Sequence, residues 1–129
     1  MQTTTTSVAS KTVVFNATLT SGQERPNPSN APAEAGGHFH AQLDGTTLKW
    51  TLTVTHLSGP ATSAHIHVGG SASNGVIAAR LCGPCAAFVT GAVILTPSVA
   101  SALLAGDAYV NVDTAANPKG EIRGQIVRG

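Results

Sequence analysis

Apolar and polar residues alternate along most of this chain, which is the spacing of a half-buried β-strand. Residues 12–20 show it most clearly, because every second position is apolar and the positions between are mostly threonine or asparagine. Residues 37–43 and 47–57 repeat the pattern on either side of Asp44-Gly45, a dipeptide typical of a hairpin turn. The whole pattern predicts about eight strands, at 12–20, 37–43, 47–57, 64–68, 75–81, 92–96, 108–113 and 121–128.

Two segments interrupt this alternation. Residues 97–106 are predicted to form one or two helical turns, since Pro97 suits the first helical position and Gly106 suits a helix end. Residues 21–36 are rich in proline and glycine, so we expect an irregular loop that is either functional or mobile.

The pattern as a whole predicts an all-β fold, a Greek-key sandwich or barrel of about eight antiparallel strands with at most one short helix. We expect residues 1–11 to form a disordered tail and residues 12–129 to form a single domain. His56 falls on the inward positions of its strand and is expected to be a buried or rim histidine and not a ligand. One core should contain the inward-facing side chains of Phe15, Phe39, Trp50, Ile66, Val110 and Ile126.

Composition narrows the class of protein. The chain has 129 residues, of which 10% are charged, with a formal net charge of +1 and scattered basic residues. A nucleic acid is therefore not an expected partner, and no apolar run approaches the roughly 20 residues of a transmembrane segment. The first residues lack the basic and hydrophobic regions of a signal peptide, which is compatible with a mature exported form.

Two pairs of histidines carry the clearest candidate chemistry. His65 and His67 flank Ile66, and His38 and His40 flank Phe39. Side chains two residues apart on a strand point to the same face, so each pair places two imidazoles together. Neutral imidazole is a good ligand for copper, zinc, nickel or iron, so each pair is a candidate metal site. All four could share one ion only if their strands are neighbours.

Cys82 and Cys85 enclose a Gly-Pro dipeptide. In thioredoxin-like proteins such a pair opens a helix that follows a strand of a βαβ unit, and the pattern here predicts no such unit. We therefore expect a local disulfide that closes a tight turn, which implies export; a zinc site that uses both thiolates with histidines stays open.

The alternation also predicts two polar stripes near the C-terminus. Tyr109, Asn111 and Asp113 share one strand face, and Glu121, Arg123 and Gln125 share a face of the next strand. If these strands pair, Arg123 is expected to bind Asp113 or Glu121 through its guanidinium group. Such an ion pair would be either structural and solvated or part of a functional site.

Several stretches together resemble one known family and cover nearly the whole chain, from about residue 13 to 128. They are residues 15–26 (FNATLTSGQERP), 64–69 (AHIHVG), 81–85 (LCGPC), 109–114 (YVNVDT) and 117–126 (NPKGEIRGQI). In these stretches the chain resembles the chordin (CHRD) domain family. The resemblance implies a secreted or cell-surface β domain, found widely in microbes and, in animals, inside a developmental antagonist of growth-factor signalling. It implies no established enzyme activity.

The family pattern is itself similar to the copper region of Cu/Zn superoxide dismutase, which has a His-x-His strand and a later histidine on a Greek-key barrel. Where the family commonly has that later histidine, this chain has Asp113. By this analogy Asp113 would supply a carboxylate oxygen in place of a nitrogen, giving a harder and weaker site for copper. Redox chemistry of the dismutase type is correspondingly disfavoured.

Three classes of function remain. The first is a secreted, periplasmic or cell-surface module that binds a copper or zinc ion through His65 and His67, with Asp113, His38 or His40 completing the site. The second is a structural or adhesive domain without a metal, with a homo-oligomer or protein partner. The third, a dismutase-like oxidoreductase, is disfavoured. We therefore expect a binding module more than an enzyme. No catalytic triad, paired catalytic carboxylates or phosphate-binding loop is supported.

Overall fold

The computed structural model of the chain describes residues 12–129, so the expected disorder of residues 1–11 lies outside the described part. A single nine-stranded antiparallel sheet contains all the strands of residues 12–129. The elements are β1 (Val13–Thr20), the 3-10 turn η1 (Ser21–Gln23), β2 (Gly36–Asp44), β3 (Thr47–Thr55), β4 (Ala61–Val68), β5 (Val76–Cys82), β6 (Phe88–Ile94), α2 (Pro97–Leu104), β7 (Ala108–Thr114), β8 (Ile122–Gln125) and β9 (Val127–Arg128).

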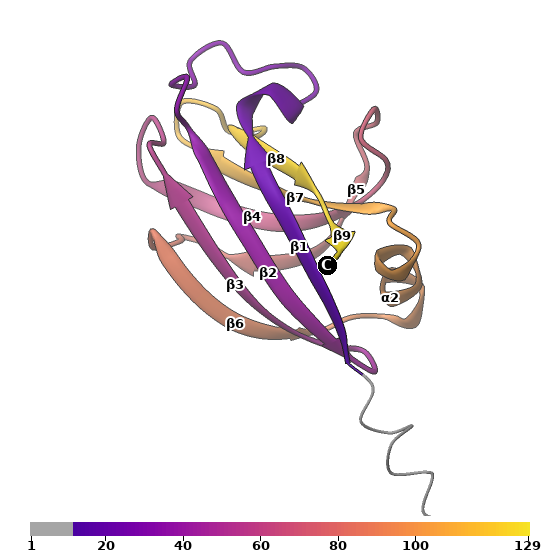
Figure 1. Cartoon of the computed structure of the whole chain (residues 1–129). Helices are drawn as coiled ribbons and strands as arrows, with labels where there is room; N and C mark the ends of the chain where they lie inside the picture. The colour runs from indigo at the N-terminus through magenta and orange to yellow at the C-terminus, as the bar shows by residue number, and fades with distance from the viewer. Residues whose placement is uncertain (1–11) are drawn as a thin grey trace, which may run out of the picture.

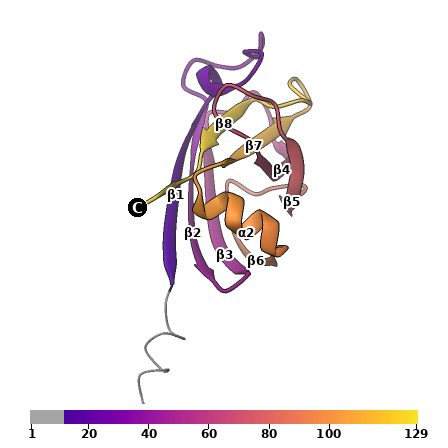
Figure 2. The ribbon, with the colours of Figure 1, turned by 90° about the vertical axis from the view of Figure 1, so that its right-hand side faces the viewer.

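The strand order is β5-β4-β7-β8-β1-β2-β3-β6, with β9 pairing to β1. The connections from β3 to β4 and from β6 to β7 cross between distant strands, as in Greek-key barrels. The sheet curls around its core into a nearly closed barrel, and α2 packs beside it (Figures 1 and 2). The predicted all-β fold with one short helix is confirmed.

The core forms from the inward positions that the alternation predicts. Each strand of the β1-β2-β3 meander buries every second side chain, as expected for a sheet with one face against the core. The six side chains predicted for the core are all at most 4% exposed: Phe15, Phe39, Trp50, Ile66, Val110 and Ile126. In β4, Ile66 is fully buried between His65 and His67, so the predicted orientation of this strand is confirmed.

The helix begins and ends at the residues that the sequence indicates. The Thr96 hydroxyl accepts a hydrogen bond from the Val99 backbone N–H, and Pro97 takes the first helical position. Gly106 follows the helix with φ +78°, and its N–H donates to the Leu103 carbonyl. This arrangement is the usual glycine-terminated helix end, which satisfies carbonyls that the helix leaves free.

Several boundaries differ from the prediction, among them the start of β4, which lies at Ala61 in place of residue 64. The strand expected at 92–96 is β6, which begins at Phe88, because Gly91 marks a close approach to the Trp50 ring and not a break. The strand expected at 121–128 divides into β8, which pairs with β7 and at one residue with β1, and β9, which pairs with β1. The expected inward position of His56 is wrong, because β3 ends at Thr55 and His56 is exposed with φ +56°.

Candidate functional site

The polar residues of β7, and Arg123 of β8, are buried, so of the two alternatives for these stripes the solvated one is wrong. Tyr109, Asn111, Asp113 and Arg123 are between 2% and 8% exposed, and all seven residues of β7 are buried. The loops around them supply the cover, since residues 24–29, 74–75 and 116–120 line a cleft above these side chains. A strand with polar residues on its outer face can therefore lie inside the molecule when loops close over that face.

Arg123 holds this region together through hydrogen bonds to backbone carbonyls and not through an ion pair. Its guanidinium donates hydrogen bonds to the backbone carbonyls of Gly70 and Ser73 at 2.8 and 2.6 Å and to the Asn74 side chain at 3.4 Å. The expected hydrogen bond from Arg123 to Asp113 or Glu121 is therefore wrong, because backbone carbonyls of the β4–β5 loop take these donors. The cation thus fixes the loop that leads from β4 to β5.

The same guanidinium stacks on an aromatic ring. The Arg123 Cζ atom lies 3.4 Å from the centroid of the Tyr109 ring, and the His67 ring is parallel to Tyr109 at 4.9 Å, with 4° between the planes. His67 lies on β4 and Arg123 on β8, which flank β7 on opposite sides, so Tyr109 is held between the two. Cation–π attraction and stacking together immobilise the three side chains.

Glu121 is a structural anchor. Its carboxylate accepts hydrogen bonds from the Ser58 backbone N–H at 2.7 Å, from the Thr114 hydroxyl at 2.7 Å and from the Asn117 amide at 2.8 Å. Burial raises the pKa of Glu121, but these hydrogen bonds outweigh burial and leave the pKa below its usual value. The residue therefore stays ionised and fastens the β7–β8 connection to the segment after β3.

His67 presents one free ring nitrogen. Its Nδ1–H donates to the Gly75 carbonyl at 3.0 Å, so the neutral ring carries its lone pair on Nε2. That Nε2 atom is buried and has no hydrogen-bond partner. A histidine held by a carbonyl through one nitrogen, with the other free, has the arrangement of metal-ligating histidines.

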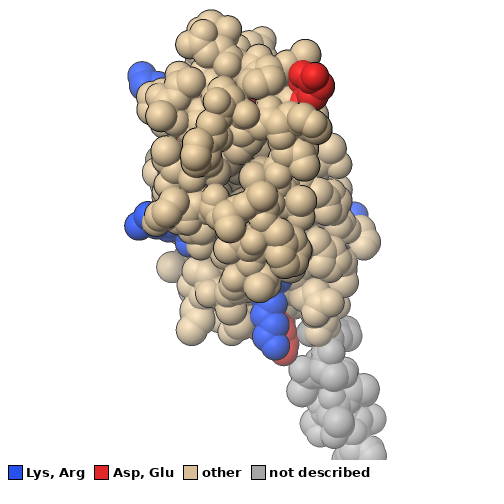
Figure 3. Space-filling view, turned by 90° about the vertical axis from the view of Figure 1, so that its left-hand side faces the viewer, with Lys and Arg blue, Asp and Glu red and all other residues tan. Residues whose placement is uncertain are grey.

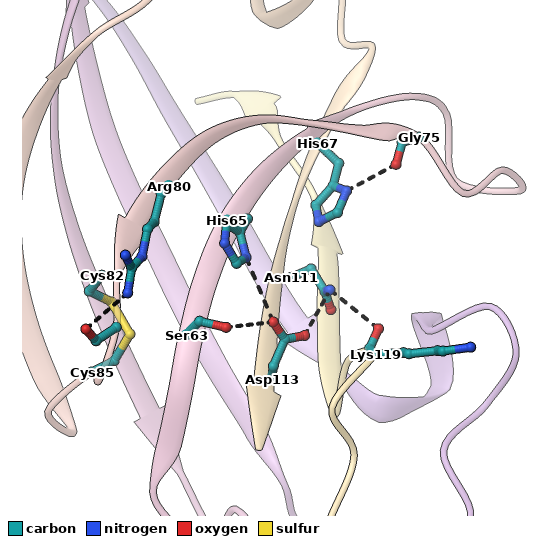
Figure 4. Close-up of polar contacts among 11 residues, drawn as sticks. Ser63, His65, His67, Gly75, Arg80, Cys82, Cys85, Asn111, Asp113 and Lys119 are labelled. Atoms are coloured by element: carbon teal, nitrogen blue, oxygen red, sulfur yellow. Dashed lines mark hydrogen bonds and ion pairs between the residues drawn. A yellow bond between two sulfur atoms is a disulfide. The ribbon is translucent and has the colours of Figure 1, made fainter. Parts of the chain in front are cut away.

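His65 lies beside both His67 and Asp113, and Asn111 lies between His67 and Asp113 (Figure 4). The His65 Nδ1 atom is 3.6 Å from Asp113 Oδ2, and the ring centroids of His65 and His67 are 6.1 Å apart. Asp113 also accepts hydrogen bonds from Ser63 at 2.7 Å and from Asn111 at 3.2 Å. Burial lowers the pKa of His65 although the Asp113 charge opposes this, so His65 is neutral at physiological pH.

The other histidine pair is separate. His38 and His40 on β2 both contact the Asn16 side-chain oxygen, at 3.2 and 3.1 Å. Strands β2 and β4 are not neighbours in the sheet, so the condition for a single site of four histidines is not met. Within residues 12–129, no group of three or more His, Cys, Asp or Glu side chains is arranged to hold a metal ion.

The cleft of about 580 Å³ brings in residues that the sequence analysis did not single out. Glu24 lies in the proline-rich loop, is 5% exposed, and has a carboxylate oxygen, Oε2, without a hydrogen-bond partner. Burial raises the pKa of Glu24 to about 8, against the lowering effect of Arg123. The only sequence signal for Glu24 is its place in the first stretch of the family resemblance.

Cys82 and Cys85 are disulfide-bonded, as predicted. The bond closes the turn after β5, where the Arg80 guanidinium donates to the Gly83 carbonyl at 3.0 Å. Its position after a strand of an antiparallel sheet, without a following helix, agrees with a structural turn and not with a thioredoxin-like site.

Comparison with known proteins identifies the family. The model of the CHRD domain matches residues 15–126. This chain belongs to the CHRD domain family. No curated protein and no solved structure matches the chain, so these comparisons give no support to the similarity with the dismutase copper region.

The match to the CHRD model covers both histidine pairs, the residues that line the cleft and the disulfide. CHRD domains are typically extracellular or periplasmic. Among residues 12–129, no helix is both long and apolar enough to cross a membrane. On the face of the domain shown in Figure 3, Lys and Arg side chains are separated by uncharged residues and form no continuous basic surface.

Proposed function

We propose that this CHRD domain is an exported, non-catalytic module that binds one copper or zinc ion through His65, His67 and Asp113. The observation that supports the proposal best is the unpartnered, buried Nε2 atom of His67. A buried polar atom without a partner costs free energy, and an ion that binds this lone pair would remove that cost.

The neighbouring groups have suitable chemistry. His65 is neutral and can offer a nitrogen lone pair, and the Asp113 carboxylate lies 3.6 Å from its ring. Two imidazoles, a carboxylate and a water molecule form a common tetrahedral zinc site. The rings are 6.1 Å apart and His67 is held by Gly75 and Tyr109, so binding requires the His65 ring and the Asp113 carboxylate to turn toward His67 Nε2. The His65 side chain is 16% exposed, which leaves it room for that movement.

Titration calorimetry with Zn(II) and Cu(II) tests the proposal. A double substitution, His65→Ala with His67→Ala, should abolish binding of one ion per chain. The matched control replaces His38 and His40 by Ala, which removes the same number of imidazoles from the other pair. Unchanged binding in the first variant, or equal loss in both, would contradict the proposal.

A second candidate function, adhesion or self-association without a metal, is favoured by a different observation. The edge strands β5 and β6 carry exposed apolar side chains, with Ile77 60% and Phe88 64% exposed. Unpaired strand edges with apolar side chains favour contacts with other chains. Sedimentation of the parent and of an Ile77→Lys variant would test this function: a dimer that the substitution dissociates supports it, and a monomer in both speaks against self-association.

A further inference from the structure

Two buried oxygen atoms face the cleft without hydrogen-bond partners. They are Oε2 of Glu24 and Oδ1 of Asn111, on side chains of residues that are 5% and 6% exposed. Both residues line the cleft of about 580 Å³. Buried acceptors in proteins are nearly always paired, so two such atoms together at one cleft indicate a missing donor.

The orientation of the Asn111 amide is fixed by its own contacts. Its Nδ2 group donates to Asp113 Oδ1 at 3.2 Å and to the Lys119 carbonyl at 3.5 Å, so Oδ1 points away from both. A Cβ atom on Gly120 would lie 2.4 Å from Asn111 Oδ1 and 2.4 Å from Glu24 Oε2, which places the two oxygens at most 4.8 Å apart. Because Gly120 has no Cβ, its backbone can lie directly against both oxygens.

Within residues 12–129 neither oxygen accepts a hydrogen bond. Arg123 also lines the cleft, but its guanidinium donates to Gly70, Ser73 and Asn74. An ammonium nitrogen contacts its acceptors at about 2.7–2.9 Å, so one nitrogen can contact both oxygens after the adjoining Gly120 backbone moves aside. Calcium takes 6–8 oxygen ligands, and the two oxygens here supply too few.

We propose that the cleft binds the primary ammonium group of a small organic ligand, held by the Glu24 carboxylate and the Asn111 amide oxygen. The volume of about 580 Å³ is within the range of small-molecule sites and leaves room for the rest of the ligand. This site adjoins the proposed metal site, because His67 lines the same cleft and Asn111 donates to Asp113, but neither oxygen belongs to a residue proposed to hold the ion.

The charged residues at the mouth of the cleft indicate the charge on the rest of the ligand. Arg25 and Lys119 line the cleft and are exposed, so the groups above Glu24 are positively charged. Opposite charges attract and like charges repel across a water-filled mouth, although salt screens both effects. A ligand with one ammonium group and a neutral or anionic remainder, as in an amino acid, fits this arrangement better than a polyamine.

Calorimetric titration of EDTA-treated protein with propylammonium chloride tests the proposal independently of any metal. Near pH 8 the probe keeps its proton, because alkylammonium groups titrate near ~10.4. We expect millimolar binding of one propylammonium per chain. Tetramethylammonium, which has the same charge but no N–H donor, should not bind, and 4-aminobutyrate should bind at least as tightly as propylammonium.

The matched variants are Glu24→Gln and Glu34→Gln. Both remove one negative charge from the same loop, but Glu34 is exposed and does not line the cleft. Glu24→Gln should weaken propylammonium binding by about tenfold or more, the loss expected for one charge-assisted hydrogen bond. Glu34→Gln should leave it within about twofold, since exposed charges act weakly.

The competing explanation is that a protonated Glu24 donates to Asn111 Oδ1 and no ligand is needed. This competing explanation predicts that propylammonium does not bind to the parent protein. Such a result would overturn the proposal by itself, before any variant is measured. Equal binding of tetramethylammonium, or equal loss in both glutamine variants, would overturn it as well. Thermal unfolding of Glu24→Gln establishes that the variant is folded before it is titrated.

Discussion

The raised pKa of Glu24 predicts a specific pH dependence of stability that replacement by glutamine should remove. In the folded chain the pKa is about 8, against an ordinary value of 4.5. Below pH 4.5 the carboxyl is protonated in both the folded and the unfolded chain. Between 4.5 and 8 only the unfolded chain releases the proton, so the free energy of unfolding falls as the pH rises.

The size of this fall follows from the two pKa values. The gap between 4.5 and about 8, at about 1.4 kcal/mol per pH unit, sets an upper limit of about 5 kcal/mol. Glu24 lines a cleft that is open to water, and solvent screening reduces such effects. We therefore expect the parent protein to lose about 2 kcal/mol of stability across this window because of Glu24.

Urea unfolding of the parent, Glu24→Gln and Glu34→Gln between pH 5 and pH 9 measures the effect. The lowered pKa of His65 works in the opposite direction, because a histidine that stays neutral when folded adds stability as the pH rises toward 6.5. This contribution is common to all three proteins and cancels in their differences. Parallel curves for the parent and Glu24→Gln would refute the reasoning, whereas the Glu34→Gln curve should follow the parent.

Four further outcomes are expected. Arg123→Met should lower the free energy of unfolding by about 3 kcal/mol in urea, because it removes two charge-assisted hydrogen bonds and a cation–π contact made by a side chain that is 2% exposed; a loss below about 1 kcal/mol would contradict this. Replacing Cys82 and Cys85 by Ala should cost about 2 kcal/mol, and adding reductant to the parent should have a similar effect. Gly124→Ala should cost about 2 kcal/mol or more, since the new Cβ would lie 2.3 Å from a backbone oxygen of β1. Asp113→His should tighten Cu(II) binding in calorimetry, because imidazole suits copper better than carboxylate; unchanged affinity would remove residue 113 from the proposed site.

Much of the fold could be predicted from the sequence, because residues close together in the chain determine the strand faces and the helix ends. Alternation fixes which face of each strand is apolar, so Ile66 could be placed in the core and the flanking histidines outside it. The helix at Pro97–Leu104 was equally readable, since its first and last residues satisfy backbone groups locally. The start of β6 was predicted too late, directly after Gly91, because no residue close to Gly91 in the sequence indicates that the Trp50 ring packs on it.

The sequence by itself determined the strands, the inward faces, the disulfide turn and the pairing of His65 with His67, all of which depend on residues close in the chain. Only the tertiary structure decided that the outer face of β7 is buried, because its cover comes from loops distant in the chain. The same folding brings Glu24 to Asn111 and gives Arg123 backbone carbonyls in place of a carboxylate. Such contacts depend on how loops close over a strand, and side-chain periodicity carries no information about that.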